Sequence, residues 1–167
     1  MEPWIPAENS LISFPALITS TSPEETFALG ESFASLLKKG DVVALKGPLG
    51  AGKTCFVKGI ARGLGIEEAV TSPTYTIVSE YEAVLSSGSP AVLYHIDAYR
   101  LKGNDDFAAM GGEDILFADG ISLIEWSERI EDSIPREALR VDIEIIESGQ
   151  RLIRMYRLSA RKEGDNP

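Results

Sequence analysis

Cysteine, histidine and long apolar runs are scarce in this sequence, and each scarcity excludes a class of protein. The single cysteine, Cys55, rules out an internal disulfide, and the single histidine, His95, argues against a zinc site built from Cys and His. No apolar stretch approaches the roughly 20 residues that cross a membrane, and the first residues lack the basic and apolar parts of a signal peptide. We therefore expect a protein of the reducing cytoplasm that makes no contact with a membrane.

Positive charge is scarce too, because 16 lysines and arginines stand against 26 aspartates and glutamates, which gives a net charge of −10. A field of that sign repels phosphate backbones, so we do not expect the chain to bind nucleic acid unaided. The 167 residues, 44% of them hydrophobic, suit one domain with a buried core. We expect this domain at residues 16–159, between an N-terminal extension at 1–15 and a polar tail at 160–167.

A glycine-rich motif is the most informative feature that is present. Residues 47–54 read G-P-L-G-A-G-K-T, which matches G-x-x-x-x-G-K-[ST], and they lie between an apolar run at 42–45 and a helical pattern at 55–64. In that context the motif indicates a phosphate-binding loop, because glycines let backbone N–H groups surround an anion that also faces a helix N-terminus. A strand-to-helix turn that binds nothing is the alternative. The residues expected to contact a nucleotide are Gly47, Leu49, Gly50, Ala51, Gly52, Lys53, Thr54 and Cys55.

Apolar patterns on both sides of this motif predict an α/β domain. Residues 22–25 read S-P-E-E, which is typical of a helix N-terminus, and apolar residues then recur at helical spacing until Gly40, where we expect the helix to end. Two apolar runs, 92–97 and 121–125, each finish on a carboxylate and are typical of central strands. Between them we expect a short helix at 104–110, capped by its first residue, an asparagine.

The C-terminal part changes to strict alternation. Apolar residues occupy every second position from Leu139 to Ile145, a turn follows, and a second strand returns through 151–158. This pattern predicts an antiparallel hairpin. The fold class we expect is therefore α/β, a P-loop NTPase-type three-layer domain with a mixed, mainly parallel sheet and this C-terminal hairpin.

Two carboxylates are candidates to complete the phosphate chemistry. Asp97 and Glu125 end the two predicted central strands, and the carboxyl ends of parallel strands open onto the edge where a P-loop lies. Transfer of a phosphoryl group from ATP needs a metal ion and a carboxylate that holds it. For both residues, a structural role at the strand end is the alternative. His95 lies mid-strand, so we expect it to be structural, and the role of Trp126 stays open.

The segment at 72–76 reads S-P-T-Y-T and follows the P-loop helix, where many nucleotide switches sense the terminal phosphate. The hydroxyls of Ser72, Thr74 and Thr76 suit a switch loop. A simple turn that leads into a strand explains the pattern equally well.

Four motifs together resemble the TsaE (YjeE) family. They are the P-loop at 47–54, S-P-T-Y-T at 72–76, H-I-D-A-Y-R at 95–100 and I-E-W at 124–126, in the order and spacing of that family. The resemblance covers about residues 20–158. It implies a bacterial ATPase subunit that acts with TsaB and TsaD to make threonylcarbamoyladenosine next to the anticodon of tRNA, and that contacts tRNA only through the complex.

The resemblance also implies roles for the matching residues. Thr54 and Glu125 would ligate Mg²⁺, Asp97 would be the Walker-B-like carboxylate, and Lys53 and Asp97 would be catalytic. The stretch around residues 20–24 would lie near adenine. The implied activity is a weak or partner-stimulated, Mg²⁺-dependent hydrolysis of ATP to ADP.

Two other functions fit the same motifs. A small-molecule kinase would need an acceptor pocket and a lid that carries arginines, for which Arg129 and Arg136 are candidates. A nucleotide-dependent adaptor would bind ATP and never hydrolyse it. A GTPase is disfavoured, because the sequence contains nothing like the N-K-x-D motif that reads guanine.

Overall fold

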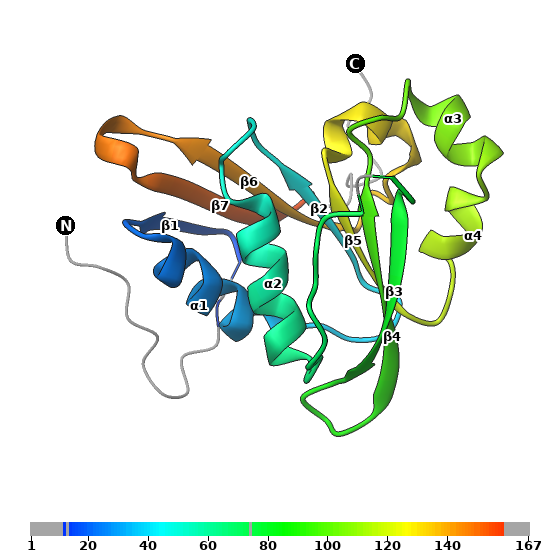
Figure 1. Ribbon diagram of the computed structural model, residues 1–167, viewed down its shortest axis with the longest axis horizontal. Helices are drawn as coiled ribbons and strands as arrows, with labels where there is room; N and C mark the ends of the chain where they lie inside the picture. The colour runs from blue at the N-terminus through cyan, green and yellow to red at the C-terminus, as the bar shows by residue number, and fades with distance from the viewer. Residues whose placement is uncertain (1–11, 13, 74, 159–167) are drawn as a thin grey trace, which may run out of the picture.

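The computed structural model describes residues 12, 14–73 and 75–158 (Figure 1). Most of the predicted extension at 1–15, Thr74 of the predicted switch loop and the predicted tail at 160–167 lie outside the described residues. The elements in chain order are β1 (Ala16–Ser20), α1 (Pro23–Ala34), β2 (Val42–Lys46), α2 (Lys53–Gly63), β3 (Val78–Val84), β4 (Pro90–Asp97), α3 (Asn104–Ala109), α4 (Gly112–Leu116), β5 (Ile121–Glu125), the 3₁₀ helix η1 (Ser127–Ser133), β6 (Leu139–Ile145), the 3₁₀ helix η2 (Glu147–Gly149) and β7 (Arg151–Arg157).

The strands form one mixed sheet of seven strands in the order β1-β7-β6-β2-β5-β4-β3. The four neighbours β6, β2, β5 and β4 run parallel, and β1 points the same way because it is antiparallel to β7, which is itself antiparallel to β6. Strand β3 is antiparallel to β4. The predicted mixed, mainly parallel sheet and the predicted C-terminal hairpin, β6–β7, are therefore confirmed.

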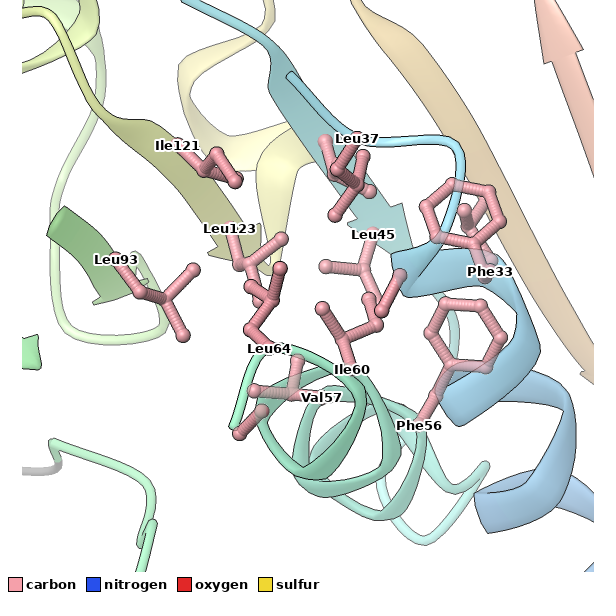
Figure 2. Close-up of a cluster of buried hydrophobic side chains, with 14 of the residues drawn as sticks. Phe33, Leu37, Leu45, Phe56, Val57, Ile60, Leu64, Leu93, Ile121 and Leu123 are labelled. Atoms are coloured by element: carbon pink, nitrogen blue, oxygen red, sulfur yellow. The ribbon is translucent and has the colours of Figure 1, made fainter. Parts of the chain in front are cut away.

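Alternate residues of the central strand β2 face two different layers of helices. Val43 and Leu45 belong to a core shared with α1 and α2, whereas Val42 and Ala44 belong to a second core shared with α3, α4 and η1. Figure 1 shows α2 on one side of strands β3, β4 and β5, and α3 and α4 on the other. In Figure 2, apolar side chains of α1 and α2 meet those of the strands in the first core. This is the three-layer arrangement that the sequence predicts.

Helix α2, which follows the P-loop, lies close against α1. A Cβ atom at Gly30 would meet the backbone carbonyl of Phe56, and one at Gly59 would meet the backbone carbonyl of Phe27. Only glycine leaves room for this approach. Because α1 and the sheet both pack against α2, the start of that helix is fixed in place at the edge of β2.

Two predicted features of the helices are wrong. Helix α1 ends at Ala34 and not at Gly40, because the chain tightens there into successive turns in which each N–H bonds to the carbonyl three residues earlier. Asn104 is the first helical residue of α3, and its Oδ1 accepts from the backbone N–H and the hydroxyl of Ser133 at 3.1 and 3.0 Å. The residue at the cap position is Gly103, which has no side chain to donate or accept.

Candidate functional site

The P-loop connects β2 to α2 at the edge of the sheet where the parallel strands end. Gly50 and Gly52 adopt φ angles of +76° and +103°, a conformation that residues with a side chain rarely adopt. Helix α2 starts at Lys53, directly after this turn, so its first backbone N–H groups face the loop. The strand, loop and helix thus follow in the order that the motif requires.

The ammonium of Lys53 is buried inside the loop. Its Nζ donates to the carbonyl oxygens of Gly47 and Pro48 at 2.6 and 3.0 Å and lies 3.9 Å from the centroid of the Trp126 ring. Burial lowers the pKa of Lys53, and nearby carboxylates, above all Glu125, oppose that shift. Two carbonyl oxygens and an aromatic face therefore contact the ammonium of Lys53, and the charge of Glu125 acts on it from nearby.

Glu125 joins the P-loop helix to the sheet. The hydroxyl of Thr54 lies 3.1 Å from Oε1 and 2.9 Å from Oε2 of Glu125, and Nε2 of His95 lies 2.8 Å from Oε1. Glu125 is 3% exposed and His95 is fully buried. The predicted magnesium ligands, Thr54 and Glu125, are thus in direct contact, although they are 71 residues apart in the sequence.

Asp97 lies beside Glu125, since the two residues pair in register on β4 and β5. Its Oδ2 accepts from the hydroxyl of Ser72 at 2.5 Å, and its Oδ1 accepts from the backbone N–H of Tyr99 at 3.0 Å. The second contact caps the turn after β4, which is the structural role at the strand end that the sequence leaves as an alternative. The first contact connects Asp97 to the predicted switch loop. Thr76, another residue of that loop, is exposed to solvent.

These residues surround a pocket of about 440 Å³. Among the described residues, it is lined by every predicted site residue except Gly47, Ala51 and Thr76. Ala51 is fully buried in the core behind the loop, and Gly47 takes part through its carbonyl oxygen. The structure therefore gathers the predicted loop, both carboxylates and Ser72 around one opening.

Sequence reasoning missed the aromatic wall of this pocket. Tyr99 and Trp126 line it, with ring centroids 4.9 Å apart. Trp126 adopts a left-handed conformation with a φ of +57°, which costs a residue with a side chain about 1 kcal/mol or more. Both residues belong to motifs that the sequence shows, H-I-D-A-Y-R and I-E-W, but neither motif indicates that the Trp126 ring covers Lys53.

A second residue that sequence reasoning missed is Arg151, the first residue of β7. Its Nε donates to the carbonyl oxygen of Ala51 and its Nη2 to that of Gly50, both at 3.0 Å. It also lines a pocket of about 170 Å³, together with Thr21 and Pro23, and this pocket shares Gly50 and Gly52 with the larger one. This smaller pocket borders the stretch around residues 20–24, which the resemblance to the TsaE family implies to lie near adenine.

The oxygen atoms of Thr54 and Glu125 are the kind of donor that Mg²⁺ prefers. Among residues 12, 14–73 and 75–158, no group of three or more His, Cys, Asp or Glu residues is placed to hold a metal ion. Magnesium is usually held by one or two carboxylates together with the phosphates of a substrate. The site thus fits Mg²⁺ as part of a nucleotide complex.

Comparison with known proteins decides the family. The family model described as threonylcarbamoyl adenosine biosynthesis protein TsaE matches residues 20–153, most of the chain. The chain belongs to the TsaE family. Two relatives named tRNA threonylcarbamoyladenosine biosynthesis protein TsaE are each 40% identical to it: the Treponema pallidum protein over 80% of this chain and 95% of its own, and the Bacillus subtilis protein over 86% and 87%. A crystal structure of YdiB from Bacillus subtilis, 35% identical, superposes with a TM-score of 0.69 over 90% of each chain.

Membership of the TsaE family confirms the resemblance that four sequence motifs indicate, and it assigns the chain to the biosynthesis of threonylcarbamoyladenosine in tRNA. The range that matches the TsaE model contains the P-loop, both strand-end carboxylates and Arg151. In the described part of the chain, no helix has the length and apolar character needed to span a membrane.

Proposed function

We propose that this member of the TsaE family is the subunit that binds and hydrolyses ATP, with Mg²⁺, during threonylcarbamoyladenosine synthesis. The contact between Thr54 and Glu125 supports the proposal most directly. It joins a P-loop hydroxyl to a buried carboxylate inside a pocket that also contains the ammonium of Lys53. Hydroxyl, carboxylate and ammonium are the three groups that phosphoryl transfer from ATP requires in a P-loop protein.

Each group has a separate task in this proposal. The backbone N–H groups of 47–52 and the ammonium of Lys53 hold the phosphates, and Lys53 exchanges its carbonyl partners for phosphate oxygens. Thr54 and Glu125 hold Mg²⁺, which neutralises the charge that develops on the terminal phosphates. Adenine occupies the smaller pocket beside Thr21 and Pro23, which shares Gly50, Gly52 and Cys55 with the larger one.

The contact between Ser72 and Asp97 connects the phosphate site to the surface. In our proposal ATP orders the loop at 72–76 and thereby favours docking on TsaB and TsaD, and hydrolysis weakens that docking so that the complex resets. The partner proteins contact the tRNA, which agrees with the net charge of −10 on this chain. The proposed place of action is the cytoplasm.

Binding and modification assays with Lys53→Ala test this function. We expect calorimetry to show about 10- to 100-fold weaker binding of ATP, because a charge-assisted hydrogen bond contributes about 1.5 to 3 kcal/mol. Lys58→Ala is a matched control, since Lys58 is an exposed lysine of the same helix. In a reconstituted reaction with TsaB, TsaD and tRNA, Lys53→Ala should lose multiple-turnover modification and Lys58→Ala should keep it.

Several outcomes would contradict the proposal. Undiminished multiple-turnover modification with Lys53→Ala, or no uptake of ATP or ADP by the wild-type chain in Mg²⁺, would each do so. Efficient phosphorylation of a small metabolite by the chain alone would support the kinase instead. Binding of ATP without hydrolysis, even with TsaB and TsaD present, would support the adaptor. In the structure Arg129, a lid candidate of the kinase hypothesis, lies over the Tyr99 ring at 5.2 Å.

A further inference from the structure

His95 is the only histidine of the chain and is fully buried on β4, where its Nε2 lies 2.8 Å from Oε1 of Glu125. Its other ring nitrogen, Nδ1, is buried without a hydrogen-bond partner among the described residues. A buried polar atom without a partner costs free energy, and an apolar side chain of the same size would avoid that cost. Packing alone therefore does not explain an imidazole at this position.

The direction of this hydrogen bond follows from the role proposed for Glu125. In the proposed magnesium complex Glu125 is an ionised carboxylate, which can only accept, so Nε2 of His95 carries the ring proton and donates a hydrogen bond to Oε1 of Glu125. With Oε1 engaged in this way, Oε2 is left for the hydroxyl of Thr54, which lies closer to it, at 2.9 Å. A hydroxyl has one proton and two lone pairs. When the hydroxyl of Thr54 donates its hydrogen bond to Glu125, the lone pairs of the Thr54 oxygen are available to a cation.

We propose that His95 is a positioning residue for magnesium. It holds the carboxylate of Glu125 in the one orientation that accepts a hydrogen bond from the hydroxyl of Thr54 and leaves the lone pairs of the Thr54 oxygen free to bind the metal. Without this donor, the terminal torsion of Glu125 has a broad range of allowed values, and the carboxylate is free to turn away from Thr54. This inference rests on the proposed function, because it concerns the metal of the nucleotide complex.

Two substitutions separate positioning from packing. His95→Gln keeps an N–H donor near the place of Nε2, whereas His95→Leu fills the space without a donor. Calorimetry would measure the affinity for ADP in Mg²⁺ and again in EDTA, and the ratio of the two affinities is the gain due to magnesium. We expect His95→Leu to reduce this gain by about 10- to 100-fold, the usual loss when the partner of a metal ligand is removed. His95→Gln should keep most of the gain, and affinities in EDTA should stay close to wild type.

The outcomes distinguish this inference from the proposed function. An equal magnesium gain in the wild type and in His95→Leu would overturn the positioning role and leave the proposed function intact. No magnesium gain in the wild type, or no binding of ADP, would overturn the proposed function itself.

A second measurement uses the wild-type protein, so it does not depend on whether a variant folds. In untagged protein labelled with ¹⁵N-histidine, the single imidazole gives one pair of ring signals. We expect a protonated Nε2 whose signal shifts when Mg²⁺ is added to the ADP complex. An Nε2 without a proton, or signals that do not respond to Mg²⁺, would overturn the positioning role.

Discussion

Glu125 and Asp97 occupy matching positions on neighbouring parallel strands, yet they hydrogen bond to different parts of the molecule. Glu125 contacts Thr54 in the first turn of α2 and a buried histidine, both held by the core of the domain. Asp97 contacts Ser72 and the backbone of Tyr99, both in segments without regular secondary structure. The same edge of the sheet thus carries one carboxylate attached to a fixed helix and one attached to a connecting loop.

This difference suits two separate tasks. A metal ligand must be held in one geometry, and Glu125 is held from both sides. A group that responds to the state of a nucleotide must change partners at low cost, and a hydrogen bond from a loop residue to Asp97 meets that need. Substitution of each carboxylate in turn tests whether the two differ in this way.

The largest effect is expected for Glu125→Gln. Glutamine keeps the size of the side chain and removes the negative charge that faces Thr54, so we expect partner-stimulated ATP hydrolysis to fall by about 100- to 1000-fold, the range for loss of one preorganised electrostatic contact. The magnesium gain in ADP affinity should fall with it. If Asp97→Asn reduced that gain to the same degree, both carboxylates would hold the metal and the contrast between them would be lost.

A smaller effect is expected for Asp97→Asn. Asparagine can still accept from the N–H of Tyr99, so the turn after β4 should stay intact while the charge beside Ser72 is removed. We expect hydrolysis with the partner proteins to fall by about 10- to 100-fold, and ADP affinity in Mg²⁺ to change far less. Single-turnover experiments would measure the loss of hydrolysis, and calorimetry would measure the change in ADP affinity. Equal losses in affinity and in hydrolysis would show that Asp97 acts through binding.

The sequence predicts the part of the site that follows from local pattern. The P-loop and the strands that end at Asp97 and Glu125 are marked by motifs and apolar runs, and the rule that parallel strands end at one edge places them together. The edge strand β1 gives no such signal, because its pairing partner is β7, more than 130 residues further along the chain. The same holds for Arg151, whose P-loop contacts depend on the hairpin folding back.

The left-handed conformation of Trp126 is a further feature that the sequence does not predict. Non-glycine residues adopt positive φ only where the surrounding structure imposes it, and here the surroundings are Tyr99 and the ammonium of Lys53. His95, which contacts Glu125, differs from Trp126 in this respect, because strand periodicity predicts a buried residue at position 95. Periodicity does not show which atom of the next strand the imidazole meets.

A third prediction concerns the loop alone. Ser72→Ala removes the hydrogen bond to Asp97, and we expect backbone amides at 72–77 to exchange with solvent about tenfold faster, which corresponds to about 1.4 kcal/mol. Exchange in α2 should not change. Hydrogen exchange measured by mass spectrometry, with and without nucleotide, would check both statements. Faster exchange in α2 as well would mean that the loop and the helix open together. That result would contradict the view that Asp97 and Glu125 are attached to independent parts of the molecule.

The smallest effect is expected for Thr54→Ser, and it shows which atom of the P-loop helix Glu125 requires. Serine keeps the hydroxyl that reaches both oxygens of Glu125 and loses only a methyl group, so the magnesium gain in ADP affinity should stay near the wild-type value. Thr54→Val is the matched opposite, because it has nearly the same shape and no hydroxyl. If the hydroxyl is the group that matters, Thr54→Val should lose the magnesium gain as Glu125→Gln does, while neither change at Thr54 should alter exchange at 72–77. A loss of the gain in Thr54→Ser would mean that the packing of the methyl group, and not the hydrogen bond, holds the two residues together.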